Sequence, residues 1–152
     1  MDPLSSVMLR AALTWLLVGV VIGAAMLTYR ALPGQWRLWM APSHAHMLFV
    51  GWFLQFAVGV AYWLLPRHRS PERPLGYREG TAYLAVGALN LGLVLRIIAE
   101  SAERTGHESD LTMAVLIASA LLQVAAALMF IVQLWPRVAA RPLRGAHERS
   151  TR

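Results

Sequence analysis

The sequence predicts an all-α fold, an integral membrane four-helix bundle whose helices run up, down, up and down. Of the 152 residues, 57% are hydrophobic and only 14% are charged, whereas about 25% of the residues of a soluble domain are charged. The charges lie in short segments between long apolar stretches. We therefore expect one transmembrane domain over residues 1–152, in contact with a lipid bilayer.

Four stretches have the length and polarity of membrane spans, since a bilayer core needs about 20 apolar residues per helix. They cover residues 11–29, 44–65, 81–99 and 111–135. The first is longer than the apolar part of a secretion signal, about 7 to 15 residues, so we expect it to be retained. Short connectors between the spans favour antiparallel neighbours.

The arginines predict the orientation, because positively charged short loops stay on the cytoplasmic side. All 14 basic residues are arginines. They concentrate in the connector 66–80 and in the basic tail 136–152, whereas the connector 100–110 carries four acids and one arginine. We expect both termini to be cytoplasmic, in a multi-pass protein of a bacterial inner membrane.

Two features of the composition exclude classes of function. Because the chain has no cysteine, disulfide scaffolds, cysteine-ligated zinc, iron–sulfur clusters and cysteine nucleophiles are excluded. The basic residues are divided among connectors rather than gathered on one face, which argues against nucleic acid as a partner.

Small and polar residues recur along one face of the first two spans. Gly19 and Gly23 form a small-xxx-small pair, and Gly51, Gln55 and Gly59 form a row with a spacing of four residues. Such rows let helices approach closely, so Gly19 and Gly23 are expected to serve helix packing or dimerisation. We expect Gln55, like Asn90 in the third span, to join helices by hydrogen bonds.

The segment Met40–Met47, with the sequence MAPSHAHM, carries the strongest functional signal. Ser43 follows a proline and is a plausible N-cap, which would place His44 in the first turn of the second span. Ionisable residues that enter a membrane span are candidates for functional sites, and neutral imidazole is a common metal ligand. His44 and His46 are therefore candidate ligands.

On a regular helix His44 and His46 lie about 200° apart, so they face different partners. The face below His44 is small and polar, whereas the face below His46 is aliphatic and aromatic. We expect His44 to point into the bundle, with Gly51 and Gly59 leaving room for a flat porphyrin beside Gln55. If His46 faces lipid, we expect it to reach the headgroup layer. In the alternative, both histidines only cap or hydrogen-bond the start of the helix.

Several other residues are candidates for the same site. His107 is a candidate second axial ligand, or else a solvated loop residue. Arg96 either pairs with a haem propionate or forms an i, i+4 pair with Glu100. Further sources of a second ligand are a symmetry-related chain and the methionines Met40, Met47 and Met113. His68 and His147, which lie among arginines, are expected to be solvated.

The run SHAHMLFVGWFLQFAVGVAYWLLPR, Ser43–Arg67, resembles the second transmembrane helix of the large subunit of haem-copper oxidases, in the nitric oxide reductase and C-type oxidase branch. Tyr62, Trp63 and Pro66 stand where the pattern of that helix ends. The resemblance implies a low-spin haem ligand at His44 or within a residue or two of it, so His46 stays open. It does not extend to the helices that hold the copper histidines, so no oxygen or nitric oxide reduction is implied.

These observations lead to a main hypothesis and two alternatives. The main hypothesis is a membrane protein that binds b-type haem near its outer face, for electron transfer or for haem or gas sensing, and is not an enzyme by itself. The first alternative is a copper-handling protein, since thioether and imidazole suit cuprous ion; its ligands would be Met40, His44, His46 and Met47. The second is an accessory subunit of a respiratory complex. A redox protein or a second copy of the chain are the expected protein partners.

Overall fold

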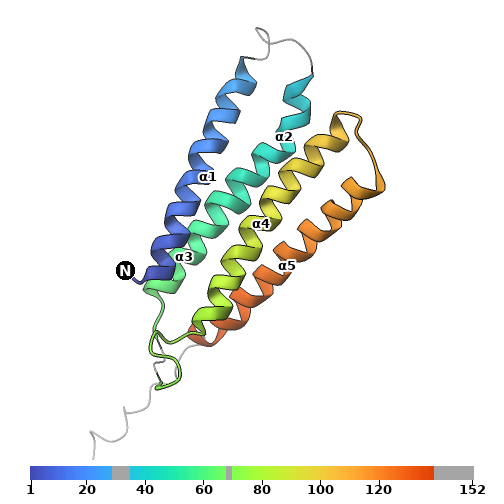
Figure 1. Ribbon diagram of the computed structural model, residues 1–152. Coiled ribbons are helices and arrows are strands. Elements are labelled where there is room, and N and C mark those ends of the chain that lie inside the picture. The colour runs from blue at the N-terminus through green and yellow to red at the C-terminus, as the bar shows by residue number, and fades with distance from the viewer. Residues whose placement is uncertain (29–34, 68–69, 139–152) are drawn as a thin grey trace, which may run out of the picture.

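The computed structural model describes residues 1–28, 35–67 and 70–138. His68, His147 and most of the basic tail lie outside the described residues. The elements are α1 (Pro3–Leu27), α2 (Trp36–His46), the π-helix η1 (Met47–Leu54), α3 (Gln55–Leu64), α4 (Glu79–Arg104) and α5 (Asp110–Val138). Because α2, η1 and α3 follow one another without a break, they form one rod, and the described residues make four antiparallel rods (Figure 1). The predicted all-α class with four helices is confirmed.

Each rod is long and apolar enough to cross a membrane. The four candidate spans are Pro3–Leu27, Leu38–Leu64, Glu79–Arg104 and Asp110–Val138. The outer surfaces of α1 and α5 expose many large apolar side chains, such as Leu17 and Leu121, which indicates a lipid bilayer environment. The chain is thus a multi-pass membrane protein by the length and composition of its helices.

Two predicted helix starts are wrong. Helix α1 begins at Pro3 rather than at residue 11, because the Asp2 carboxylate caps it by accepting from the Ser5 amide at 2.8 Å. The second rod begins at Trp36 rather than at residue 44, so Ser43 is not an N-cap. Instead, Pro42 lies inside α2, because a membrane helix tolerates proline when neighbouring groups satisfy the freed backbone atoms.

The second rod and α4 occupy the middle of the molecule. Helix α1 packs on the second rod, the second rod packs on α4, and α4 packs on α5 (Figure 1). Among the described residues, α1 makes no contact with α5. The faces of α1 and α5 that turn away from the middle are therefore open to lipid or to a partner.

Glycines allow the close approach of neighbouring helices. A Cβ built on Gly19 would lie 2.6 Å from Cδ2 of Leu48, and one built on Gly92 would lie 2.9 Å from the Ser119 carbonyl oxygen. Gly19 and Gly23 therefore serve helix packing inside the chain, which is the first of the two roles, packing or dimerisation, that the sequence predicts.

Buried polar side chains join the rods near their middle. Trp15 Nε1 donates to Asn90 Oδ1 at 2.8 Å, which links α1 to α4. Gln55, which is fully buried, donates to the Met8 carbonyl at 3.3 Å. The prediction that Gln55 and Asn90 tie helices together is confirmed.

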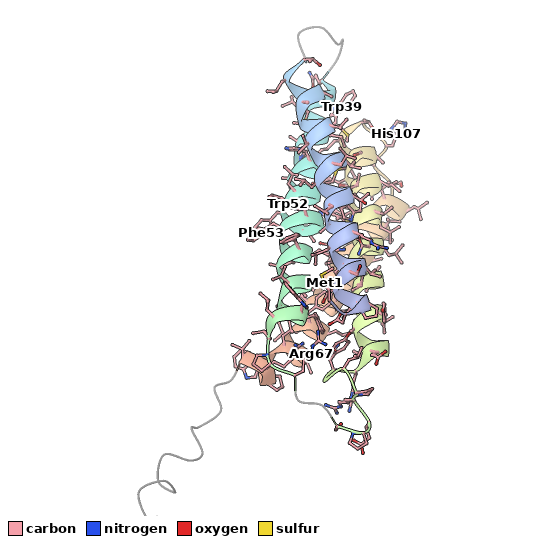
Figure 2. All side chains as sticks on the ribbon, turned by 90° about the vertical axis from the view of Figure 1, so that its left-hand side faces the viewer. Met1, Trp39, Trp52, Phe53, Arg67 and His107 are labelled. Carbon is pink, nitrogen blue, oxygen red and sulfur yellow. The ribbon has the colours of Figure 1, made fainter. Side chains whose placement is uncertain are left out.

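The two ends of the bundle differ in chemistry. We call the end that carries His44, His46 and Glu100 the histidine end, and the opposite end, which carries Arg67 and Arg137, the arginine end. Figure 2 shows the labelled Trp39 and His107 at the histidine end and Arg67 at the arginine end.

Candidate functional site

The two histidines of the second rod contact different neighbouring helices. His44 Nδ1 lies 2.9 Å from the Gly19 carbonyl oxygen of α1, and its ring packs so closely on Gly23 that a Cβ there would lie 2.7 Å from His44 Cε1. His46 Nδ1 lies 2.9 Å from the Pro42 carbonyl oxygen and 4.0 Å from Oε2 of Glu100 in α4. The expected separation of the two imidazoles is thus present, and His44 points to a neighbouring helix as predicted.

His46 lies beside α4, with 29% of its side-chain surface exposed. The expected headgroup position applied only to a His46 that faces lipid. The physical reason for its position beside α4 is the charge on that helix, because an imidazole next to a carboxylate is better solvated than one in hydrocarbon. The spacing of residues within the second rod does not show which residues of α4 lie beside it.

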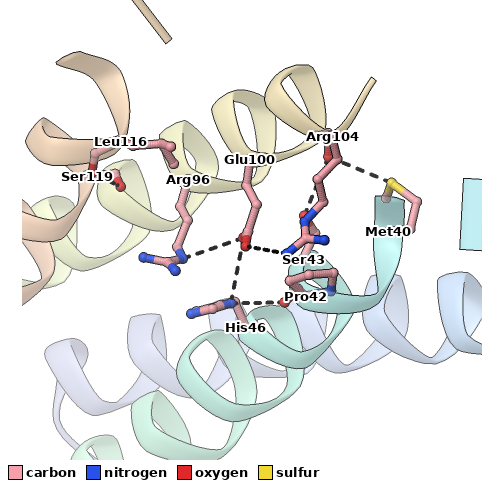
Figure 3. Close-up of polar contacts among 10 residues, drawn as sticks. Met40, Pro42, Ser43, His46, Arg96, Glu100, Arg104, Leu116 and Ser119 are labelled. Atoms are coloured by element: carbon pink, nitrogen blue, oxygen red, sulfur yellow. Dashed lines mark hydrogen bonds and ion pairs between the residues drawn. The ribbon is translucent and has the colours of Figure 1, made fainter. Parts of the chain in front are cut away.

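Glu100 is the centre of a charged cluster at the histidine end (Figure 3). Its Oε2 lies 3.6 Å from Arg96 Nε, and its Oε1 lies 3.9 Å from Arg104 Nη2. The structure therefore places Arg96 in the i, i+4 pair that was the alternative to a propionate contact. Arg96 Nε and Glu100 Oε2 are buried and have no hydrogen-bond partner among the described residues. The pair is electrostatic only, and both groups keep hydrogen-bonding capacity.

The hydrogen bonds of the two imidazoles define their tautomers. A main-chain carbonyl oxygen only accepts, so in both His44 and His46 the proton lies on Nδ1, which donates it. In the neutral form of each ring, the lone pair then lies on Nε2. Histidines that ligate metals have this arrangement, in which the second ring nitrogen donates to a carbonyl or a carboxylate.

The strip below His44 faces inward as predicted, but it offers no room for a porphyrin. Gly51, Gln55 and Gly59 are buried. A Cβ on Gly51 would lie 2.6 Å from Cγ of Trp15 and 2.8 Å from Cδ2 of Leu93, and neighbouring side chains of α1 cover Gly59 in the same way. Larger side chains of α1 and α4 thus fill the clearance that the glycines create, and the expected haem position along this strip is wrong.

The remaining candidates are not gathered at one point. His107 is exposed in the connector after α4, where its Nδ1 lies 3.1 Å from Thr105 Oγ1 (Figure 2). Met113 is exposed on α5. No group of three histidine, aspartate or glutamate side chains in residues 1–28, 35–67 and 70–138 is close enough to hold a metal ion.

The structure divides the proposed copper ligands between two faces of the second rod. Met47 is buried beside Gly19 of α1, on the same side as His44. Met40 Sδ lies 3.8 Å from Ser101 Oγ of α4, on the side of His46. The four side chains therefore do not converge.

Two features near His46 were not predicted from the sequence. The first is the position of Glu100 near His46. The spacing of residues in α4 predicted only the pair of Glu100 with Arg96. The second is η1, the π-helix that begins immediately after His46; such segments are rare and are frequently found at functional sites. A proline four residues before His46 and a glycine five residues after it are the only local signals of this irregularity.

Comparisons of the chain with protein-family models, with curated proteins and with solved structures find no match.

Proposed function

We propose that this chain is a multi-pass protein of a bacterial inner membrane that binds a b-type haem at its histidine end, with His46 as an axial ligand. The observation that carries the proposal is the fixed Nδ1 of His46, which leaves the Nε2 lone pair available. His46 is preferred to His44 because the His44 ring packs tightly on Gly23 of α1, whereas the His46 ring lies beside the charged side chain of Glu100.

The surface next to His46 supports a site outside the bundle rather than along the buried glycine strip. Phe49 and Phe53, in the two turns that follow, are exposed and stacked with ring centroids 5.9 Å apart. Exposed aromatic rings offer a flat apolar surface for a macrocycle. Arg96 lies on the neighbouring helix with an unsatisfied Nε, and it would hold a propionate in competition with Glu100.

A haem in this position supplies one-electron transfer or gas binding. The residues of the chain orient the ligand: the Pro42 carbonyl fixes the His46 ring, and Glu100 lies near the same Nδ1. Because His44 and Met47 face α1 and His107 lies in a connector, we propose that the second ligand comes from a second copy of the chain or from a redox partner.

An absorption spectrum tests the proposal. Protein purified from cells grown with adequate haem is expected to show a Soret band, and His46→Gly is expected to abolish it while membrane insertion is retained. Added imidazole should restore the band in the His46→Gly variant, because it replaces the missing ligand without changing the fold.

Control variants show which histidine is the haem ligand. His107→Gly is expected to leave the spectrum unchanged. If His44→Gly alone abolishes the band and imidazole restores it, the ligand is His44 and the assignment to His46 is wrong. Failure of the wild-type protein to show a Soret band, even after reconstitution, would refute haem binding, and stoichiometric copper in metal analysis would favour the copper alternative.

A further inference from the structure

A cavity of about 550 Å³ opens at the arginine end. It lies between the connector that precedes α4 and the last turns of α5, two segments that meet at the bottom of Figure 1. Part of its wall is basic, with Arg73, Arg78 and Arg137, and part is apolar, with Leu128 and Val132. The cavity therefore suits a ligand that is both anionic and apolar.

Buried polar atoms in the wall have no partner. Among the described residues, none donates to or accepts from the Tyr77 hydroxyl, Arg137 Nη1 or the side-chain amide of Gln133. Tyr77 and Arg137 are each only 4% exposed. Buried polar groups are almost always hydrogen-bonded, so these three side chains of one wall have hydrogen-bonding capacity for a bound polar group.

The charge of the cavity wall indicates that a bound group would be negatively charged. Of the described residues that line the cavity, three are arginines and none is acidic, and the nearby Asp2 carboxylate is paired with Arg67 at 2.7 Å. Arg137 is already held by carbonyl oxygens through Nε and Nη2, which leaves Nη1 for a ligand. Guanidinium groups bind phosphate through paired hydrogen bonds.

The apolar wall continues into the membrane-spanning part of α5. Leu128 and Val132 are exposed, and above them Val124 and Leu121 extend the same apolar surface along the helix. A ligand with its phosphate among the arginines can therefore lay a hydrocarbon chain against α5.

We propose that this cavity is a specific binding site for an anionic phospholipid, whose phosphate contacts Arg73, Arg78 and Arg137. Basic pockets between membrane helices are a recognised way to hold anionic headgroups. The site lies at the opposite end of the bundle from His46 and does not depend on haem binding.

Lipid binding by the full chain in nanodiscs tests the proposal, with phosphatidylglycerol and phosphatidylcholine as the two probes. We expect phosphatidylglycerol to bind at least tenfold more tightly than phosphatidylcholine. Arg73→Gln combined with Arg78→Gln should remove most of this preference. The matched control combines Arg10→Gln with Arg104→Gln, which removes the same charge from exposed arginines outside the cavity and should change the affinity less than twofold.

A second variant distinguishes a built site from general attraction to charge. Val132→Trp keeps every charge but fills the apolar part of the cavity, so it should weaken phosphatidylglycerol binding at least fivefold. An unchanged affinity in Val132→Trp would overturn the proposal, as would equal effects of the two arginine pairs. Inorganic phosphate alone should not protect the protein against heating; if it protects as well as the lipid does, the site binds free phosphate and the lipid assignment is wrong.

Discussion

Arg137 shows how one buried side chain ends a membrane helix. Helix α3 stops at Leu64, and its last carbonyl groups have no partner within the helix. The Arg137 guanidinium donates from Nε to Pro66 O at 3.0 Å and from Nη2 to Tyr62 O at 3.0 Å and Leu65 O at 2.7 Å. A residue near the end of α5 thus caps a helix that precedes it by about 70 positions in the sequence.

Arg137→Lys is expected to destabilise the protein, because the ammonium group cannot reach three carbonyl oxygens in the geometry of the guanidinium fork. Loss of hydrogen bonds to a charged group predicts a decrease of about 1.5–3 kcal/mol in the free energy of unfolding. Chemical unfolding in detergent micelles measures the change. Arg10→Lys, the same exchange at an exposed position, should alter the free energy by less than about 0.5 kcal/mol.

Because Tyr77 is buried, we predict that the folded protein loses stability at alkaline pH. Burial raises the pKa of its hydroxyl, and the Asp2 carboxylate adds a smaller effect in the same direction. Because the unfolded phenol ionises near its ordinary pKa of about 10 while the folded phenol stays neutral, stability is retained below pH 10 and falls as the pH rises from there toward the raised pKa. Thermal unfolding between pH 8 and 11 should show this decrease, and Tyr77→Phe should make it shallower. Equal slopes in the two proteins would contradict the prediction.

At the scale of elements, the second rod is the irregular one. Proline inside α2 and the π-helix η1 both depart from regular α-helical bonding, and departures of this kind bend helices and change the direction of side chains. They occur where the rod passes between α1 and α4. Gly51, the buried glycine of η1, lies against Trp15 and Leu93 from those two helices.

Gly51→Ala is expected to destabilise the bundle, because the new methyl group would lie 2.6 Å from Trp15 Cγ. Overpacking of this kind predicts a loss of about 1–3 kcal/mol. Gly87→Ala in α4 is the matched control, because among the described residues a Cβ there has no neighbour within 4 Å beyond the adjoining backbone of its own helix; it should leave stability unchanged or raise it by up to about 1 kcal/mol. Unfolding of the two variants in the same detergent provides the comparison, and a Gly51→Ala protein as stable as Gly87→Ala would show that Trp15 moves freely.

At the scale of the whole molecule, the arginines of the connectors predict the orientation of the bundle in the membrane. With four antiparallel spans, the N-terminus and the end of α5 lie at the same end (Figure 1). The ion pair of Asp2 with Arg67 at 2.7 Å joins the start of the chain to the first arginine of the basic connector. Because arginines are in excess at this end, we predict that it faces the cytoplasm.

Cysteine labelling tests this orientation, and the absence of native cysteine makes single variants unambiguous. Glu108→Cys and Glu72→Cys replace exposed glutamates at the two ends. A maleimide that cannot cross membranes should label Glu108→Cys in spheroplasts and should label Glu72→Cys only after permeabilisation. The reverse pattern would show that the bundle is inserted with the opposite orientation.

The sequence by itself determined the number and type of the helices, because about 20 apolar residues in a bilayer leave the backbone no alternative to a helix. It also showed the inward face of the second rod, since a spacing of four residues places Gly51, Gln55 and Gly59 on one side. The starts of α1 and α2 were not predicted, because hydropathy does not measure capping, such as the hydrogen bond of the Asp2 carboxylate to the Ser5 amide, and does not show that the helix continues before Ser43.

Only the tertiary structure decided what each face touches. The clearance beside Gly51 is filled by Trp15 from α1 and Leu93 from α4, and His46 lies near Glu100, more than fifty positions away in the chain. The reason is physical: periodicity in one helix shows which side chains point inward, but the volume and charge they meet belong to other helices. The arginine-end cavity likewise exists only because the connector before α4 meets the end of α5.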